Sequence, residues 1–106
     1  MAEEKFNTFE EFYPFYLNEH RNTGTRVTHF IGTTLFFAWI ITAIITMQPL
    51  FLLAGVITAY GFAWVGHFFI EKNKPATFKY PGMSLRGDFK MYFDIWTGKQ
   101  GFKSKR

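Results

Sequence analysis

The chain has 106 residues, the size of a single domain, and 48% of them are hydrophobic and 22% aromatic. It contains no cysteine, which excludes disulfides, thiolate metal ligands, iron–sulfur clusters and cysteine nucleophiles. The net charge of +4 comes from segments that flank a long uncharged stretch, so anionic membrane lipids are the expected partner and nucleic acid is not.

The first expected element is a helix of about residues 8–19 that lies at a membrane interface. Thr8 followed by Glu11 is a capping-box pattern, and aromatic residues recur after it at spacings of three and four. Pro14 lies inside this stretch, where its ring is unfavourable for a helix. The sequence NTGTR that follows predicts a turn into the next element.

An uncharged stretch from Val27 to Ile70 predicts two membrane-spanning helices. Gln48 and Pro49 interrupt it near its midpoint and divide it into spans of about residues 28–47 and 50–70. Each span is close to the roughly 20 helical residues that cross a hydrocarbon core about 30 Å thick. An obligate oligomer could instead bury the same surface as a soluble core. The expected fold is an all-α membrane protein, a two-span transmembrane helical hairpin flanked by interfacial amphipathic helices.

Basic residues indicate the side of the membrane on which the chain ends lie. The connection at Gln48 has no Lys or Arg, whereas the outer flanks of both spans are basic. By the positive-inside rule, both termini are expected in the cytoplasm, with the chain as a multi-pass protein of a bacterial inner membrane. Two helices form a thin wall around a reactive centre, and a homodimer is compatible with this prediction.

A loop and a further helix are expected after the second span. Two prolines and a Pro-Gly pair predict a loop over residues 72–83. Ser84 is then expected to cap an amphipathic helix of about residues 84–97. Its apolar side chains fall at steps of four, three and four residues, as on one face of an interfacial helix: Leu85, Phe89, Tyr92, Trp96. The whole chain is thus expected to form one membrane domain.

The three histidines are the candidate metal-ligating residues. His29 lies nineteen residues before Gln48 and His67 nineteen after it, so a hairpin that turns there brings both to the same depth. Glu71 follows His67 by four residues and is expected on the same helix face. His20 can fold back over this place, which would bring three imidazoles and one carboxylate together. For any one of these residues, capping or snorkelling at a helix end explains the placement equally well.

The ligand types indicate which metal such a site would hold. Imidazole and carboxylate without thiolate suit non-haem Fe(II), Mn or Zn, and two histidines with a carboxylate are used by oxygen-activating iron. Gly32 and Gly66 would allow close helix approach beside the site, which ordinary packing also explains. Two other functions fit the same residues. One is a haem-binding membrane electron carrier ligated by two histidines, and the other is a non-enzymatic membrane scaffold that binds no metal.

Three segments of the chain carry a resemblance to a known family: HRNTGTRVTHFIG, GHFFIEKNKPATF and PGMSLRGDFKMYFDIW. They resemble the family of small membrane proteins whose fungal member is a 2-hydroxy fatty acid dioxygenase in phytosphingosine breakdown. The likeness covers nearly the whole chain and includes the order of all three histidines. It implies Fe2+-dependent α-oxidation, in which O2 is used to shorten a long-chain 2-hydroxy fatty acid by one carbon. Another 2-hydroxy acyl lipid is the alternative substrate.

The resemblance also implies roles for individual residues. The family's histidines and the motif after the last of them correspond to His20, His29, His67, Glu71, Asn73 and Pro75. One set is expected to be both catalytic and metal-binding: His20, His29, His67, Glu71. Apart from the resemblance, a second set at the same membrane edge is expected to bind the substrate: Arg21, Arg26, Lys72, Asn73. For any one of the basic residues, membrane topology alone explains the placement at least as well. A 2-hydroxy acid can offer iron oxygens from its carboxylate and its hydroxyl, so the hydroxyl is expected to be required for turnover.

Overall fold

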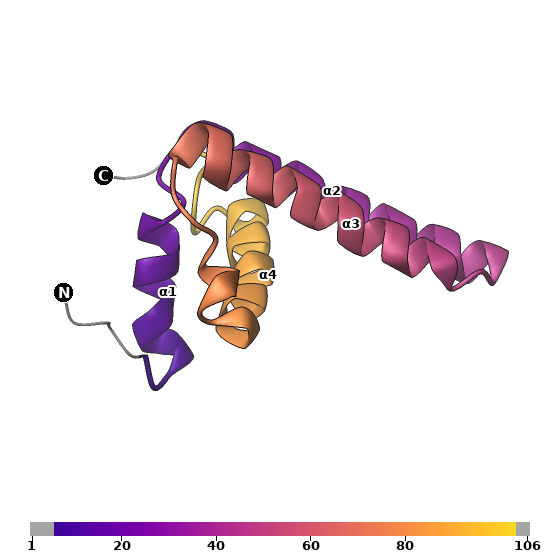
Figure 1. Cartoon of the computed structure of the whole chain (residues 1–106), viewed down its shortest axis with the longest axis horizontal. Helices are drawn as coiled ribbons and strands as arrows, with labels where there is room; N and C mark the ends of the chain where they lie inside the picture. The colour runs from indigo at the N-terminus through magenta and orange to yellow at the C-terminus, as the bar shows by residue number, and fades with distance from the viewer. Residues whose placement is uncertain (1–5, 104–106) are drawn as a thin grey trace.

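All regular structure is helical in residues 6–103, the part of the chain that this computed structural model describes. The elements in chain order are α1 (Phe9–Asn18), α2 (Thr23–Thr46), α3 (Leu50–Val65), η1 (Gly66–Glu71), η2 (Ala76–Phe78) and α4 (Pro81–Thr97). The segment η1 is a π-helix that continues α3, and η2 is a short 3-10 helix. Figure 1 shows α2 and α3 as a long pair, with α1 and α4 standing across one end of it.

The helices α2 and α3 lie side by side and are joined by residues 47–49 (Figure 1). Met47 ends α2 in the left-handed conformation, with φ 55°. Gly32 allows the two helices to approach closely, because a Cβ there would lie 2.9 Å from the Cβ of Phe62 and 3.1 Å from the backbone oxygen of Ala59. The close approach expected at Gly32 is therefore confirmed.

A hydrophobic core lies between α1, η2 and α4, beside the end of the helix pair. Its buried side chains are Phe9, Phe12, Tyr16, Ala76 and Met91. Gly87 of α4 makes room for this contact, because a Cβ there would lie 2.8 Å from the ring of Tyr16. The predicted cap is confirmed, since the hydroxyl of Thr8 accepts a hydrogen bond from the N–H of Glu11 at 3.2 Å. Pro14 is accommodated inside α1.

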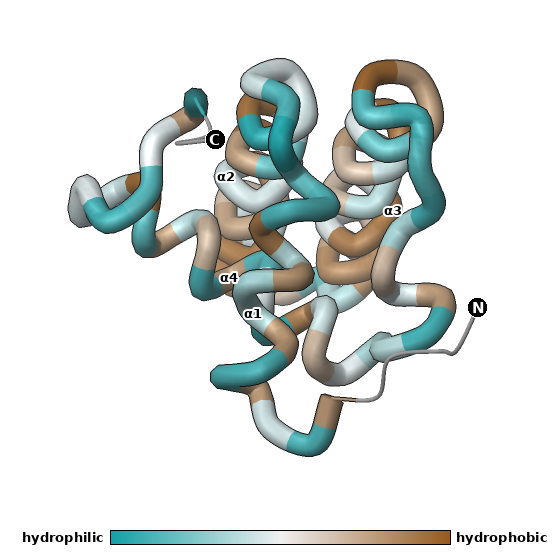
Figure 2. The backbone as a smooth tube through the Cα atoms, turned by 90° about the vertical axis from the view of Figure 1, so that its left-hand side faces the viewer, coloured by the Kyte–Doolittle hydropathy of each residue, from teal (hydrophilic) through white to brown (hydrophobic). Residues whose placement is uncertain are grey.

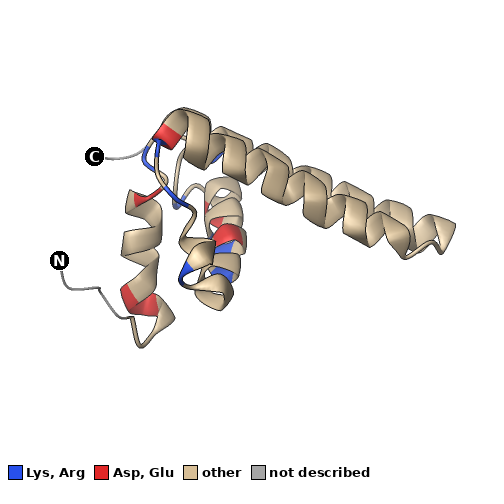
Figure 3. Cartoon of the chain, in the orientation of Figure 1, with Lys and Arg blue, Asp and Glu red and all other residues tan. Residues whose placement is uncertain are grey.

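Both long helical segments have the length and composition of membrane spans. Thr23–Thr46 and Leu50–Glu71 each contain an apolar window of which only 17% is buried, whereas the core helix of a soluble protein is mostly buried. Figure 3 shows the charged residues gathered at the end near α1 and α4, with none along the far length of the pair. Figure 2 looks onto that charged end, and its teal colour shows that the residues where the chain enters α2 and leaves η1 are hydrophilic. The two segments are therefore candidate spans.

The helix boundaries differ from the sequence prediction in two places. The helix α2 begins at Thr23 and not near residue 28, because the NTGTR sequence forms its first turn. The helix α4 begins at Pro81, where the missing N–H has no intrahelical partner to lose. Ser84 is therefore inside α4 and does not cap it, and its hydroxyl instead lies 3.0 Å from the hydroxyl of Thr77.

The helix α4 also contacts α2, and this contact uses only part of the predicted apolar face. The ring of Tyr92 packs on Phe30 of α2 with centroids 4.7 Å apart. Leu85 and Trp96 belong to the same predicted face but remain 48% and 65% exposed. The helix α4 is thus held against both α1 and α2, and it forms one wall of the cavity between α2, α3 and α4.

Candidate metal centre

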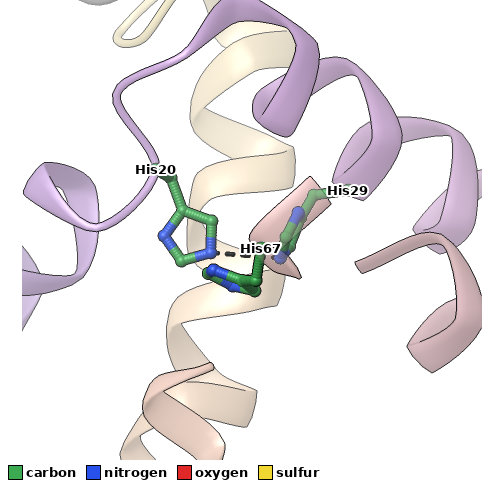
Figure 4. A group of neighbouring side chains, drawn as sticks. All are labelled: His20, His29 and His67. Carbon is green, nitrogen blue, oxygen red and sulfur yellow. Dashed lines mark hydrogen bonds between the residues drawn. The ribbon is translucent and has the colours of Figure 1, made fainter. Parts of the chain in front are cut away.

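The three histidines meet where the helix pair joins α1 and α4. His20 follows α1, His29 lies in the second turn of α2, and His67 lies in the π-helix η1. All three are buried, with exposed fractions of 1%, 6% and 2%. Figure 4 shows their rings gathered face to edge around one point. π-helical turns are rare in proteins and occur frequently at functional sites. The position of His67 in η1 is therefore typical of a functional residue.

Each imidazole donates its Nδ1–H to a carbonyl oxygen. The three donor and acceptor pairs are His20 with the backbone oxygen of Tyr16 at 2.6 Å, His29 with that of Thr25 at 2.9 Å, and His67 with Oδ1 of Asn73 at 2.7 Å. A carbonyl oxygen can only accept, so each Nδ1 must carry the proton. Nε2 of each neutral ring then carries a lone pair, which is the form in which histidine binds a metal.

The remaining ring nitrogens face one another. One nitrogen from each of the three histidines lies within 4.8 Å of the other two. Nε2 of His20 and Nε2 of His29 are only 3.0 Å apart, with no proton available between them (Figure 4). Metal–nitrogen bonds are about 2.1 Å long, so one ion can bind both atoms. The residues therefore fit a divalent metal with imidazole ligands.

Burial keeps His20 in its neutral form. The pKa of His20 lies well below its ordinary value, chiefly because burial disfavours the charged ring and also because His29 and His67 lie close to it. The ring of Tyr16 stacks on His20 with centroids 4.0 Å apart and covers its other side. A neutral, shielded imidazole is ready to bind a metal without first losing a proton.

Glu71 was expected beside the imidazoles, and the structure places it at the edge of the site. The group of possible metal ligands among residues 6–103 consists of the three histidines and does not include Glu71. Its Oε1 accepts a hydrogen bond from the backbone N–H of Asn22 at 2.9 Å, immediately before α2. Glu71 therefore connects the end of η1 to the start of α2.

Arg26 was expected to bind substrate, and it is buried among backbone carbonyls instead. Its Nε donates to the backbone oxygen of His20 at 2.7 Å, and its Nη1 donates to that of Gly101 at 2.9 Å. Only 2% of the residue is exposed. Arg26 thus stabilises the segment between α1 and α2 that contains His20. Arg21 and Lys72, from the same expected set, are exposed.

Asn73, also expected to bind substrate, contacts a histidine directly. Its Nδ2 donates to the backbone oxygen of Glu19 at 3.0 Å, which leaves Oδ1 directed at His67. Its backbone N–H donates to the backbone oxygen of His67 at 2.9 Å and closes the end of η1. Asn73 therefore fixes the orientation of the His67 ring and keeps its proton on Nδ1.

An apolar cavity of about 290 Å³ lies between α2, α3 and α4 and includes His29 in its wall. Six of its lining residues are apolar: Phe36, Val56, Ala59, Ala63, Leu85 and Phe89. Its other lining residues are His29, Thr33, Tyr60 and Asp88. A ligand with an apolar chain and a polar end could lie here with its polar end beside the imidazoles.

The histidine geometry does not suit a haem. The axial ligands of a haem lie on opposite faces of the porphyrin. The ring centroids here are only 4.4 Å, 4.5 Å and 5.0 Å apart, with the rings close to perpendicular. A porphyrin plane does not fit between two of these imidazole rings, so the structure does not support the hypothesis of a haem-binding electron carrier.

A comparison with protein families identifies the relatives of this chain. The family model described as 2-hydroxy-palmitic acid dioxygenase Mpo1-like matches residues 6–100. The chain belongs to this family. The matched range of the Mpo1-like family contains all three histidines and the whole of the cavity wall. Comparisons with curated proteins and with solved structures gave no significant match.

Sequence reasoning overlooked two polar residues beside the histidines, Tyr16 and Asp88. The hydroxyl of Tyr16 donates to Oδ1 of Asp88, and Asp88 lines the cavity. In the sequence, Tyr16 was only one of several aromatics in the first helix. Asp88 did stand on the predicted apolar side of α4, between Leu85 and Phe89, and that unusual placement was the available signal.

Proposed function

We propose that the protein is an Fe2+-dependent membrane dioxygenase that shortens long-chain 2-hydroxy fatty acids by one carbon. The observation that carries this proposal is the set of three buried imidazoles, each with Nδ1–H bound to a carbonyl, beside an apolar cavity. Membership of a family described by a 2-hydroxy-palmitic acid dioxygenase supports the substrate class. Iron is proposed because imidazole ligands without thiolate suit it and the reaction consumes O2.

We propose further that α2 and η1-extended α3 cross the membrane as a hairpin with both termini in the cytoplasm. The exposed apolar surface of the pair and its lack of charge support this arrangement. A long acyl chain could then reach the cavity from the bilayer while its polar end meets the imidazoles near the cytoplasmic edge. Arg21 and Lys72 are exposed at that edge and are proposed to attract the acid or a lipid headgroup.

The proposed reaction balances without a further reductant. A 2-hydroxy acid, RCH(OH)COOH, and O2 give RCOOH, CO2 and H2O: the bond between the two oxidised carbons breaks, and their four electrons reduce one O2. Bound to the imidazoles, iron would supply the activation of O2.

The protein's own residues would hold the metal and shield the reaction from water. His20, His29 and His67 would hold the metal through Nε2, while Asn73 and the carbonyls of Tyr16 and Thr25 keep the rings oriented. The cavity would bind the acyl chain and exclude water from the reacting carbons.

The direct test uses protein purified without chelators, loaded with Fe2+ and supplied with O2. We expect 2-hydroxyhexadecanoic acid to be converted to pentadecanoic acid, and hexadecanoic acid to be left unchanged, as measured by mass spectrometry. His29→Ala and His67→Ala should insert into the membrane but retain no metal. Turnover without O2, equal turnover of both acids, or no reaction by iron-loaded protein would contradict the proposal. Full metal content in both variants would contradict the assigned ligands.

The role of Glu71 can be separated from that of the histidines. Glu71→Gln keeps an oxygen that can accept the N–H of Asn22, so we expect it to retain metal. Glu71→Ala removes this connection and should weaken metal binding. Loss of the metal in the Gln variant as well as in the Ala variant would instead make the carboxylate a ligand. The scaffold alternative predicts no metal in any of these proteins.

A further inference from the structure

A carboxylate lies in the same cavity as His29 and has no part in holding the imidazoles. It belongs to Asp88 of α4. The hydroxyl of Tyr16 donates to Oδ1 of Asp88, and the ring of the same tyrosine stacks on His20 with centroids 4.0 Å apart. One side chain thus connects Asp88 to the metal centre and fixes where the carboxylate stands relative to it.

The hydrogen bonding of Asp88 is incomplete. Tyr16 is the one side-chain donor to this carboxylate within residues 6–103, so the second oxygen has no protein donor there. No fully buried side-chain oxygen or nitrogen among residues 6–103 lacks a hydrogen-bond partner, so this second oxygen remains accessible. A ligand that enters the cavity would displace solvent from this oxygen and must offer a donor in its place. Of the four polar side chains that line the cavity, Asp88 is the one that, when ionised, can only accept.

We propose that Asp88, held by Tyr16, accepts a hydrogen bond from the 2-hydroxyl group of the substrate and thereby selects 2-hydroxy acids over unsubstituted acids. This inference rests on the proposed function. The hydroxyl is the one hydrogen-bond donor by which a 2-hydroxy fatty acid anion differs from a plain fatty acid anion. A site built around a substrate hydroxyl discriminates against the analogue that lacks it, because its own polar group then stays unpaired.

The same carboxylate orients the substrate. When Asp88 is ionised, the two carboxylates repel each other in a site of low dielectric, so the acid group of the substrate points away from Asp88 and towards the imidazoles. The hydroxyl on the neighbouring carbon then faces Asp88, and its oxygen lone pairs remain directed at the imidazole side. Asp88 is therefore a specificity-determining residue, and Tyr16 is the residue that positions it.

The test measures binding in the absence of O2, so that no turnover is needed. It is made at a pH well above 7, because burial raises the pKa of Asp88 to about 7 and the carboxyl group must be ionised to act only as an acceptor. Three ligands are compared by quenching of tryptophan fluorescence: 2-hydroxyhexadecanoate, hexadecanoate and 2-methoxyhexadecanoate, which keeps the oxygen but has no proton to donate. Asp88→Asn is the main variant, because its amide oxygen can still accept from Tyr16 while an NH2 donor replaces the second acceptor. Tyr16→Phe is the second variant. It leaves the carboxylate of Asp88 unchanged but removes the hydrogen bond that positions it.

Asp94→Asn is the matched control. Asp94 lies on the same helix and also accepts a hydrogen bond from a tyrosine hydroxyl, that of Tyr13 at 2.9 Å, but it does not line the cavity. Metal content and circular dichroism are compared for all variants, so that a misfolded protein is recognised before binding is interpreted.

We expect the wild type and Asp94→Asn to bind the 2-hydroxy acid at least about 10-fold more tightly than the other two ligands. Asp88→Asn should lose this preference while keeping its metal, and Tyr16→Phe should reduce it. An unchanged preference in Asp88→Asn would overturn the inference and assign the discrimination to the metal alone. Equal binding of the three ligands by the wild type would also overturn it.

Failure of the proposed reaction would look different. Iron-loaded wild type that binds 2-hydroxy acids selectively through Asp88 but never shortens them would contradict the dioxygenase proposal and leave this recognition role intact. Turnover with a preference that Asp88→Asn does not change would do the reverse.

Discussion

Nε2 of His20 and Nε2 of His29 lie 3.0 Å apart, although both rings carry their proton on Nδ1. Two lone pairs held at this distance repel each other, and the repulsion is strong in a buried site of low dielectric. A cation between them replaces the repulsion with two bonds. Metal binding and the stability of this end of the molecule are therefore expected to be coupled.

Removal of the metal should lower the melting temperature of the protein. At a metal concentration 100 times the dissociation constant, binding to the folded state adds about 2.7 kcal/mol of stability. We expect a chelator to lower the Tm of the wild type by several degrees and to leave the Tm of His29→Ala unchanged, as measured by differential scanning fluorimetry. A chelator effect of equal size in both proteins would argue against a metal at these histidines.

Substitution of Asn73 should weaken metal binding even though it is not a ligand. Asn73→Ala removes the acceptor of the His67 Nδ1–H and frees the ring to rotate. Loss of such a partner typically reduces metal affinity by about 10-fold to 100-fold. Asn73→Asp keeps the acceptor and should retain most of the affinity. Competition with a metal-binding dye measures both, and equal affinities in the Ala variant and the wild type would disprove the orienting role.

Gly66→Ala should separate His67 from His29. A Cβ at Gly66 would lie 2.5 Å from Oγ1 of Thr28 and 3.3 Å from the Cα of Thr25. The hydroxyl can rotate away, but the backbone of α2 cannot, so η1 must shift. We expect a loss of about 1–3 kcal/mol in stability together with weaker metal binding.

The matched control for this substitution is Gly61→Ala. Nothing lies within 4 Å of a Cβ at Gly61, which is in the same helical segment. The helix propensity of alanine should make this variant neutral or more stable by up to about 1 kcal/mol. Chemical unfolding and metal titration of both variants measure the difference. Equal behaviour of the two would show that the close approach at Gly66 is unimportant.

The orientation in the membrane can be tested with single cysteines, since the chain has none of its own. A cysteine at Gln48, in the uncharged turn, should react with a membrane-impermeant maleimide from outside the cell. A cysteine at Lys103 should react only after the cells are opened. Labelling of the Gln48 position from the cytoplasmic side alone would reverse the proposed topology.

The stability of the metal-free protein should depend on pH through Asp88. Burial raises the pKa of this carboxyl group to about 7, even though the hydrogen bond from Tyr16 lowers it. The unfolded value is about 3.9, so the folded state holds the proton more tightly. The resulting stability is complete below about pH 4 and is lost as the pH rises to about 7.

Asp88→Asn removes this group without changing its shape. The unfolding free energy of the wild type minus that of Asp88→Asn should therefore decrease between pH 4 and pH 7. Denaturation in mixed micelles at several pH values measures this difference. A difference that stays constant or increases over the range would contradict the buried position of Asp88.

The sequence alone determined the helical architecture and the convergence of the histidines. An uncharged stretch interrupted at Gln48 and Pro49 can form only two long apolar helices, and the structure has α2 and α3 there. The equal spacing of His29 and His67 about Gln48 places both at one level, as found. These features depend on periodicity and chain length, which are local properties of a sequence.

Only the tertiary structure decided what the polar side chains around the histidines do. Arg26 and Asn73 were expected to meet substrate, yet they hold His20 and His67, and the carboxylate of Glu71 meets Asn22 rather than the imidazoles. Tyr16 and Asp88 are 72 residues apart in the chain and gave no sign of a contact. A hydrogen-bond partner is selected by the rotamer of each side chain and by how helices from distant segments pack, and neither is encoded by the spacing of residues along one helix.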